Sequence, residues 1–378
     1  MKFSCTKENL HRGLFFAAHI ASKTNALPIL GNVLLEAKSG ALTIISTNLE
    51  IGIRAAIRGK VDEEGSFTVD AKLITDYVGF LPNDRVDVEL IRAAEPATGS
   101  ALKITAGETT TTMHGNSAEE FPLLPAVERT VTIQLPAKEL RGAIAQTLFA
   151  AAQDEGRPEL HGVLMTIDYG NLTLAATDSF RLAERKLMLT TPATGAESHQ
   201  AIVPQRTLAE LLRIVSALEE TTQVELAFSK NQAMLSAEGV EVISRLVDRK
   251  YPDYVQVIPA SSPIVARFPK AEFVNAIRAA SLFCRSGVND VRLALDGNVV
   301  TIAASGARGD HSAKLTGEIT GGPSEVVLNY RYLLDGLNAI AAQNVKLELT
   351  SANQPCILRA ADGPDANQYL YLIMPIKQ

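Results

Sequence analysis

The sequence predicts an α+β fold in which three repeated domains each place two helices on one side and β-sheets on the other. One series of elements returns three times at intervals of about 130 residues, and repeats of that length are whole structural units. The 378-residue chain is also too long for one ordinary core, whereas three domains of roughly 125 residues have a common size. We place the domains at residues 1–126, 127–260 and 261–378, because proline-rich stretches near Ala126 and Ala260 interrupt the pattern.

The clearest part of the repeat is a β-hairpin. The segment LGNVLLEAKSGALTIISTN from Leu30 returns from Leu160 as LHGVLMTIDYGNLTLAATD, and more loosely from Val288 as VNDVRLALDGNVVTIAAS. Each copy has two runs of alternating apolar residues that meet at a turn glycine, which is typical of paired strands with one buried face. The turn glycines are Gly40, Gly170 and Gly297.

The elements around each hairpin repeat as well. A helix-like stretch precedes each hairpin, within residues 6–22, 136–153 and 269–285, and the last two open on a proline, which the first turn of a helix tolerates. A strand that runs into a second helix follows from Phe67, Ala201 and Val326, and a closing strand from Val86, Gln223 and Val345. Hairpins of any β-rich protein look alike, but here the order of elements recurs too, so we prefer a true repeat.

Several protein classes are excluded by composition. No run of 18 apolar residues could span a membrane, and the amino-terminal MKFSCTKENLHRG lacks the apolar block of a signal peptide. Cys5, Cys284 and Cys356 are odd in number, far apart and without clustered histidines, which indicates neither a disulfide framework nor a metal site. We therefore expect a cytoplasmic protein with reduced thiols and no bound metal.

Catalytic motifs are absent from the sequence. It contains no GxxxxGK[ST], GxGxxG, HExxH or GxSxG. The adjacent carboxylates Asp154-Glu155 and Glu119-Glu120 point in different directions on most backbones and are usually solvated. We expect no catalytic residue and no cofactor. An enzyme with an unrecognised site is the rival hypothesis, and it predicts turnover or a bound cofactor.

Charge is distributed unevenly along the chain. Overall it is acidic, with 36 Lys and Arg against 42 Asp and Glu and a net charge of −6, yet basic residues outnumber acidic ones in the expected helices. A surface lined by these helices would be positive on an acidic body, unless the excess is an ordinary feature of helix composition. Packed helices lie about 8–10 Å apart, so roughly twelve would surround a DNA duplex. One chain offers half of them, and two chains related by symmetry would close a ring.

Five segments resemble the bacterial DNA polymerase III β subunit family, the sliding clamps, and together they extend over nearly the whole chain. They are LPILGN at 27–32, ATDSFRLA at 176–183, SRLVD at 244–248, YPDY at 251–254 and MPIK at 374–377. The resemblance implies three domains of the DNA-clamp type that close as a homodimeric ring around double-stranded DNA, without reading its sequence. It also implies opening by a clamp loader and tethering of the DNA polymerase III α subunit and other proteins that carry a clamp-binding motif. A scaffold that binds only proteins is the second alternative.

The resemblance further implies a partner-peptide pocket and a DNA-facing surface. The pocket would comprise Leu160, Thr177, Ser179, Phe180, Arg181, Leu182, Pro252, Val257, Leu372, Ile373, Met374, Pro375, Ile376 and Lys377. The DNA-facing residues would be Lys23, Gln153 and Arg157, joined by the helix residues Lys72, Arg206 and Arg285. Leu182, Val257 and Met374 could instead be ordinary core residues, as apolar residues at strand spacing generally are.

A subunit contact is expected at the first helix of the third domain. If Phe273, Ile277, Ala280 and Cys284 form its buried stripe, Leu282 falls on the opposite side at about 100° per residue. The resemblance implies that Leu282 and Phe283 face Met113 in the first domain of a partner subunit. The chain departs from the family pattern at Thr24, Pro158-Glu159, Phe180 and Gln256, which leaves the DNA contacts and the peptide preference open.

Overall fold

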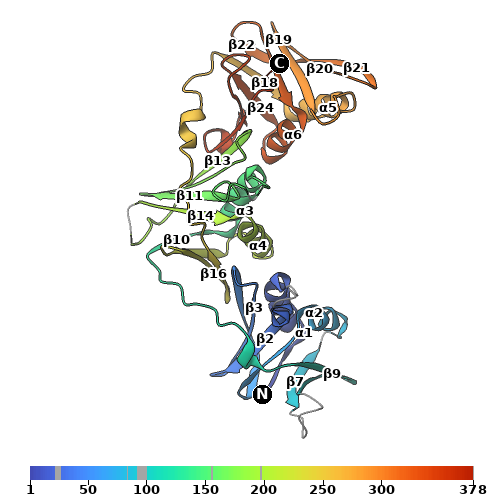
Figure 1. The fold of residues 1–378 in the computed structure, drawn as a ribbon, viewed down its shortest axis with the longest axis vertical. Coiled ribbons are helices and arrows are strands. Elements are labelled where there is room, and N and C mark those ends of the chain that lie inside the picture. The colour runs from blue at the N-terminus through green and yellow to red at the C-terminus, as the bar shows by residue number, and fades with distance from the viewer. Residues whose placement is uncertain (22–26, 83, 92–99, 155, 196–197, 378) are drawn as a thin grey trace. The chain divides into compact units, whose positions relative to one another are not determined.

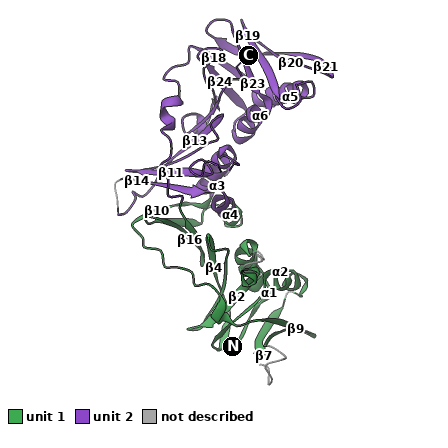
Figure 2. Ribbon diagram, in the orientation of Figure 1, with its two compact units in different colours: residues 1–137, 213–246 green, residues 138–212, 247–378 purple. Residues whose placement is uncertain are grey.

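The computed structural model describes residues 1–378 except 22–26, 83, 92–99, 155, 196–197 and 378, so Lys23 and Thr24 lie outside the described residues. The chain divides into two compact units (Figure 2). Unit 1 comprises residues 1–137 and 213–246, and unit 2 comprises residues 138–212 and 247–378. The division falls at the start of α3 and inside α4, so the middle repeat contributes strands to both units.

Unit 1 contains α1 (Lys7–Ala17), α2 (Ala71–Phe80) and a thirteen-stranded sheet in the order β10-β15-β16-β17-β4-β3-β2-β6-β9-β8-β7-β1-β5 (Figure 1). Its strands are β1 (Lys2–Thr6), β2 (Asn32–Lys38), β3 (Ala41–Thr47), β4 (Ile51–Ile57), β5 (Lys60–Glu63), β6 (Gly65–Asp70), β7 (Arg85–Ile91), β8 (Ala101–Ala106), β9 (Thr109–Asn116), β10 (Val131–Pro136), β15 (Gln223–Phe228), β16 (Gln232–Ala237) and β17 (Val240–Arg245). Short 3-10 helices are η1 (Ala18–Ile20), η2 (Pro28–Gly31) and η4 (Ala118–Glu120).

Unit 2 holds two antiparallel sheets, of nine strands in the order β14-β11-β12-β13-β26-β25-β24-β18-β22 and of four in the order β21-β20-β19-β23. Its strands are β11 (Gly162–Asp168), β12 (Asn171–Thr177), β13 (Arg181–Met188), β14 (Ser198–Pro204), β18 (Ile264–Pro269), β19 (Asp290–Asp296), β20 (Val299–Gly306), β21 (Gly309–Thr316), β22 (Glu318–Thr320), β23 (Ser324–Asn329), β24 (Asn344–Leu349), β25 (Cys356–Ala360) and β26 (Tyr369–Ile373). Its helical segments are α3 (Ala137–Thr147), η5 (Leu148–Ala150), the first part of α4 (Gln205–Ser216), η6 (Tyr254–Val257), α5 (Lys270–Ser281), α6 (Tyr330–Ala339) and η7 (Pro364–Asn367).

Side chains at the helix starts explain several boundaries. Thr6 accepts a hydrogen bond from Asn9 N at 3.2 Å and begins α1, while Asp70 accepts one from Leu73 N at 2.9 Å and begins α2. Each satisfies an amide that a helix start leaves without an internal partner. The predicted first helices are confirmed but extend less far, because α1 and α3 tighten into the 3-10 turns η1 and η5 and α5 ends at Ser281. The two prolines expected to open helices lie one residue before α3 and α5.

The repeated hairpins are present as predicted. β2 pairs with β3, β11 with β12 and β19 with β20, each as antiparallel neighbours. In the first hairpin Ser39 and Gly40 adopt φ values of 53° and 74°, the left-handed conformation that a tight two-residue turn requires at both positions. The α+β class and the threefold repeat are therefore confirmed, because each repeat contributes two helices and its own sheet strands.

Sheets continue from one repeat into the next, a feature that no pattern in the sequence predicts. In unit 1, β4 of the first repeat pairs with β17 of the second, with Ile53 opposite Val242. In unit 2, β13 of the second repeat pairs with β26 of the third, with Leu182 opposite Leu372. We call these pairings the first and the second junction. Because strands pair across both junctions, compactness alone does not separate the repeats, and the boundaries at 126 and 260 remain predictions.

No helix among the described residues is long and apolar enough to cross a membrane. The three cysteines are free, with Cys5 and Cys356 buried and Cys284 half-buried. Burial, and then the nearby Asp290 carboxylate, raises the pKa of the Cys284 thiol to about 11. Burial likewise raises the pKa of the Cys356 thiol to about 12. These raised pKa values favour the protonated thiols near neutral pH.

Candidate functional site

The candidate peptide site is formed by a loop, a linker and a tail in unit 2: residues 177–182, 251–258 and 372–377. The loop joins β12 to β13 and is fixed by its own side chains. Thr177 Oγ1 donates to Arg181 O at 2.6 Å and accepts from Ser179 N at 3.1 Å. Asp178 Oδ1 accepts from Phe180 N at 2.9 Å and from Arg181 N at 3.0 Å. Ser179 has a φ of 78°, and Phe180 is turned outward, with 61% of its surface exposed.

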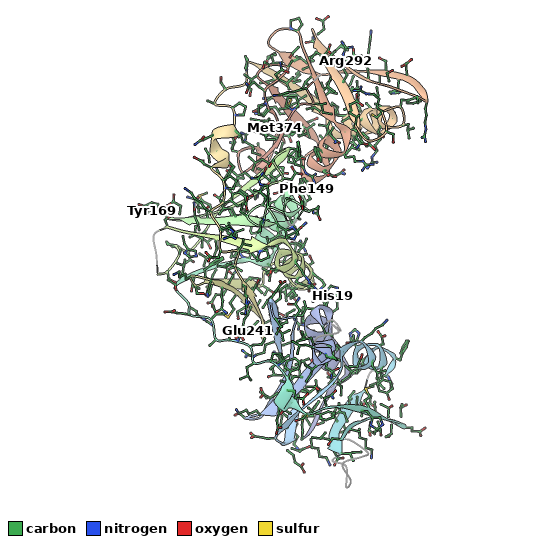
Figure 3. All side chains as sticks on the ribbon, viewed as in Figure 1. His19, Phe149, Tyr169, Glu241, Arg292 and Met374 are labelled. Carbon is green, nitrogen blue, oxygen red and sulfur yellow. The ribbon has the colours of Figure 1, made fainter. Side chains whose placement is uncertain are left out.

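The carboxyl-terminal tail is tied to this loop. β26 lies beside β13, and Met374, labelled in Figure 3, follows it directly. Met374 N donates to Phe180 O at 2.8 Å, which continues the strand pairing by one residue beyond β26. Ile376 N donates to Val327 O at 2.8 Å. Pro375 and Ile376 are half-buried and Lys377 is exposed. The tail therefore forms one side of the site through backbone hydrogen bonds.

Tyr254 of the linker joins the two apolar clusters beneath the site. It packs against a cluster that contains Leu160 and Tyr251, and against another that contains Leu182 and Leu372. Its hydroxyl donates to Glu184 Oε2 at 2.7 Å. Burial, and then the Glu184 carboxylate, raises the pKa of Tyr254 well above its ordinary value. The tyrosine therefore stays neutral and holds the linker against both clusters.

Tyr251 also fixes the linker, through contacts with the loop and with Tyr254. Its hydroxyl accepts a hydrogen bond from Thr177 N at 3.1 Å, and its ring meets that of Tyr254 edge to face, with centroids 6.4 Å apart. Burial raises the pKa of Tyr251 well above its ordinary value. Tyr251 and Tyr254 were both within the quoted YPDY segment but not among the predicted site residues. The recurrence of an aromatic-proline pair at Phe121-Pro122 could have identified Tyr251, whereas Tyr254 corresponds to Leu124 and had no such signal.

The predicted pocket residues separate by burial. Leu160, Leu182, Leu372 and Ile373 are buried and so support the site from within the chain. The residues that can meet a ligand are on the surface or half-buried: Thr177, Ser179, Phe180, Pro252, Val257, Met374, Pro375, Ile376 and Lys377. The alternative of an ordinary core was raised for Leu182, Val257 and Met374, and it fits buried Leu182 and, in part, half-buried Met374. It does not hold for Val257, which is exposed on η6.

Arg181 connects the loop to the third repeat. Its guanidinium pairs with Asp178 at 3.0 Å and with Asp335 of α6 at 2.5 Å, and it lies 4.6 Å from the ring centroid of Tyr332 and 5.6 Å from that of Phe149. Only 11% of the Arg181 side chain is exposed. Arg181 was predicted as a pocket residue, and in the structure its charge is paired with partners within the chain. Asp335 could not be paired with it from sequence, since 154 positions separate the two.

The predicted DNA-facing residues that the structure describes are exposed, but two of them have partners. Arg157 donates to Ser179 Oγ at 2.8 Å and pairs with Glu159 at 3.3 Å, which places it beside the candidate peptide site. Arg285 pairs with Asp290 at 2.5 Å. The others that the structure describes are exposed: Lys72 on α2, Gln153 after η5 and Arg206 on α4. Lys23 lies outside the described residues.

Not every basic helix residue is free for DNA. In unit 1, Arg213 of α4 donates to Phe15 O at 2.8 Å and to Phe16 O at 2.9 Å, at the end of α1. Its guanidinium also lies 4.8 Å from the centroid of the Phe15 ring. Arg213 and Lys72 line one pocket of about 530 Å³. Part of the basic excess on the helices is thus used within the chain.

The predicted subunit-contact residues differ sharply in exposure. Leu282 is 66% exposed at the end of α5, as its place outside the buried stripe required. Phe283 is half-buried and stacks on His311 of β21, with ring centroids 5.6 Å apart. Met113 is only 5% exposed, because its side chain faces the interior of unit 1 from β9. Met113 therefore offers almost no surface to another subunit, and its exposed neighbour His114 lies on the other face of the strand.

Comparisons with known proteins agree over the full chain. Three family models of the DNA polymerase III beta subunit match the sequence in succession. The N-terminal domain matches residues 1–125, the central domain residues 134–253 and the C-terminal domain residues 255–377. A protein of Staphylococcus aureus named beta sliding clamp is 32% identical, covering 100% of this chain and 99% of its own length. A sliding clamp of Staphylococcus epidermidis is 30% identical over the same shares.

Solved structures show the same likeness in three dimensions. The DNA polymerase III subunit beta of Pseudomonas aeruginosa, bound to griselimycin, has a TM-score of 0.91 and 27% identity, with 100% of both chains covered. The DNA polymerase sliding clamp of Bacillus subtilis has a TM-score of 0.91 and 26% identity, covering 100% of this chain and 99% of its own.

Proposed function

The chain belongs to the DNA polymerase III beta subunit family, and we propose that two copies close head to tail into a ring around duplex DNA. It is a sliding clamp of DNA replication and has no catalysis of its own. The ring, its subunit contacts and its partners are the parts that we propose. The observation that carries the proposal is a pair of unpaired strand edges, one in each unit.

Among the described strands, β21 pairs only with β20, and β9 pairs with β6 only at residues 115 and 116. Each strand is eight residues long, and each leaves backbone donors and acceptors on one edge without a strand partner. An open edge of this length is a template for pairing with another chain. Pairing of β9 in one copy with β21 in the other would repeat at a second, equivalent contact and would close the assembly.

Each unit also has exposed apolar side chains outside its strands. On α2 of unit 1, Leu73, Tyr77 and Phe80 follow one another at helical spacing on one face, and Phe80 is 89% exposed. In unit 2, Leu282 is exposed beside Phe283. Because isolated exposed apolar residues are common but a stripe of them is not, these two patches are suited to cover one another in the dimer. In this arrangement Phe80 and its stripe replace Met113 as the apolar partner of Leu282.

Replacing Leu282 by aspartate tests the subunit contact. We expect Leu282→Asp to give a monomer in sedimentation equilibrium, because a desolvated carboxylate would lie in the contact. Tyr169→Asp is the matched control, since Tyr169 is also a large exposed side chain but lies at the tip of the β11–β12 hairpin (Figure 3). A Leu282→Asp protein that keeps the mass of a dimer would exclude this contact.

Duplex DNA would be held mainly by enclosure. Lys72, Arg206 and Gln153 are exposed and suited to contact phosphates, which carry no sequence information. Such contacts weaken with salt, whereas a closed ring cannot leave a closed circle. We therefore expect salt-resistant retention on nicked circular DNA after loading by a clamp loader, and loss when the circle is cut. Equal retention on linear and circular DNA would indicate ordinary adhesive binding and would contradict the ring.

The candidate peptide site would receive the clamp loader, the DNA polymerase III α subunit and other proteins with a short clamp-binding segment. Exposed Phe180 and Val257 and half-buried Met374 offer apolar contacts, and the tail offers main-chain groups. Because all partners would use one site on each subunit, they would compete.

Removal of residues 374–378 tests this site. The truncation deletes one side of it, together with the hydrogen bonds from Met374 N and Ile376 N. We expect calorimetry to show no binding of a short synthetic peptide with leucine and phenylalanine anchors, while the mass in solution stays that of a dimer. Binding by the truncated protein with unchanged affinity would mean that the site has been placed wrongly.

A further inference from the structure

The first junction contains a pocket of about 470 Å³, which we call the Thr47 pocket. All of its lining lies in unit 1: the β3–β4 loop at residues 47–52, the linker at residues 122–125, and three residues of β16 and β17. Two of the lining residues are exposed and apolar, Leu49 at 47% and Leu123 at 94%. Nothing in the proposed function uses this pocket.

The loop of the Thr47 pocket repeats the loop of the candidate peptide site bond for bond. Thr47 Oγ1 donates to Ile51 O at 3.0 Å and accepts from Leu49 N at 3.0 Å. Asn48 Oδ1 accepts from Glu50 N at 3.0 Å and from Ile51 N at 2.8 Å. These are the bonds that Thr177 and Asp178 make in the second junction. Leu49 also takes the left-handed conformation, with a φ of 75° against 78° at Ser179.

The neighbouring segments correspond in the same way. Arg245 N donates to Glu50 O at 3.1 Å, as Met374 N does to Phe180 O. In the linker, Leu124 packs against two apolar clusters, one containing Phe121 and the other Ile243, as Tyr254 does in the second junction. The Thr47 pocket is therefore a second copy of the candidate peptide site, built at the previous junction of the repeat.

The side chains that the two copies present differ in charge. Glu50 stands in the first loop where Phe180 stands in the second, and Glu50 lines the pocket together with Arg245. Exposed Glu119 and Glu120 precede the first linker, where exposed Arg249 and Lys250 precede the second. Within the lining, Glu50 and Arg245 balance each other, so the excess charge comes from the start of the linker, which is acidic at the first junction and basic at the second. An occupant of the first pocket should therefore carry positive charge.

We propose that the Thr47 pocket is a second docking site, for a short peptide segment of a partner protein that places an apolar side chain beside lysine or arginine. The inference rests in part on the proposed role of the candidate peptide site, whose loop it duplicates. Leu49, Leu123 and the prolines of the linker supply the apolar contact. Glu50 in the lining, with exposed Glu119 and Glu120 just before the linker, selects the charge. Since the two sites lie in different units, one subunit can bind two partners of opposite charge preference at the same time.

Methyl NMR of the leucine-labelled full chain tests the proposal with two synthetic peptides. Both peptides carry the same leucine and phenylalanine anchors, flanked in one by lysines and in the other by glutamates. The lysine peptide should shift the methyl signals of Leu49 and Leu123, and the glutamate peptide should not. Glu50→Lys should lower the affinity for the lysine peptide roughly fivefold, as measured from the shifts of these methyl signals, because one favourable charge pair becomes repulsive. Glu219→Lys, an equal change of charge at an exposed turn of unit 1, should leave its affinity unchanged.

The same spectra separate this inference from the proposed function. Shifts confined to Leu182 and Leu372, which lie beneath the candidate peptide site, would overturn the second site and leave the first in place. Equal shifts of Leu49 and Leu123 by both peptides would overturn the charge preference that defines the proposal. Shifts of Leu49 and Leu123 by the lysine peptide, lost in Glu50→Lys, would support it even if the candidate peptide site bound nothing.

Discussion

The first and second junctions of this chain have the same backbone and different side chains. In both, a threonine and an Asx residue close the loop by four hydrogen bonds, and the residue after them is left-handed. Gly52 lies in the first loop where Leu182 lies in the second, and a Cβ on Gly52 would come within 2.3 Å of Leu124 Cδ2. Leu124 thus fills space that Leu182 and Tyr254 share in the second junction. The repeat supplies a rigid loop, and the chemistry of each site resides in the side chains it carries.

Removing the linker side chain should loosen each junction separately. Tyr254→Ala leaves a cavity between two clusters and a buried Glu184 without its hydroxyl donor, which should cost about 3 kcal/mol of local stability. Leu124→Ala removes less buried surface and should cost about 2 kcal/mol. Hydrogen exchange measures both effects. Tyr254→Ala should accelerate exchange in the sheet that contains β13 and β26 and not in the sheet that contains β4 and β17, and Leu124→Ala should do the reverse; acceleration in both sheets by either variant would refute separate junctions.

The junctions should also differ in how much they depend on ion pairs. Arg181→Met leaves Asp178, with 14% of its side chain exposed, without its partner, and should cost about 2 kcal/mol in β13 and β26. The ion pair across the first junction joins Arg54 to Glu241 at 2.8 Å and is more exposed. Arg54→Met should therefore cost less than about 1 kcal/mol in β4 and β17. Equal losses of stability in Arg181→Met and Arg54→Met would mean that the burial of an ion pair does not determine how much it stabilises its junction.

Of the two junctions, only the second should lose stability at high pH. The pKa values of Tyr251 and Tyr254 are raised above the ordinary 10.0, by burial in both cases and then by Glu184 for Tyr254. A group whose pKa is raised by folding contributes stability that is present below its pKa in the unfolded chain. That stability is lost as the pH rises through its pKa in the folded protein. The corresponding residues of the first junction, Phe121 and Leu124, do not titrate. Burial also raises the pKa values of Tyr332, Tyr369 and Tyr371, so several tyrosines should ionise late in an ultraviolet titration. The number that ionise well above pH 10 should fall by two in the Tyr251→Phe, Tyr254→Phe variant; an unchanged number would contradict this assignment.

The smallest effect is expected at the two left-handed residues. Ser179 and Leu49 hold positive φ values that glycine adopts without strain. Ser179→Gly and Leu49→Gly should therefore stabilise their loops by about 1 kcal/mol or less, since glycine also gains freedom in the unfolded chain. Slower hydrogen exchange at Phe180 and Glu50 would report the gain. Ser179→Ala is the control and should give none; a gain equal to that of glycine would show that strain is not the cause.

Local patterns predicted most of the elements. Alternating apolar runs identified the hairpins, and the capping residues Thr6 and Asp70 agree with helix starts that sequence rules can locate. The same rules overestimated the helix ends, because the final turns of α1 and α3 tighten into 3-10 geometry without a sequence signal such as a glycine. Leu282 was placed on the exposed side of its helix correctly from spacing alone.

Long-range pairings were beyond sequence reasoning. The junction sheets join strands more than a hundred residues apart, and one residue pattern fits many registers. Arg181 could be named as a site residue, but its partner Asp335 comes from another repeat. Met113 was expected at a subunit contact and is buried. Alternate side chains of β9 face the interior of unit 1, and only the three-dimensional sheet determines which of them do so.

Covalent closure of the dimer tests the central claim of a ring most directly. A bifunctional reagent that joins the two subunits at both contacts should leave the protein linked around a covalently closed circular DNA, with no bond to the DNA itself. The account predicts that the cross-linked protein stays on the circle in denaturing detergent and leaves when a single restriction cut makes the DNA linear. Loss of the cross-linked dimer from the intact circle in detergent would contradict encirclement.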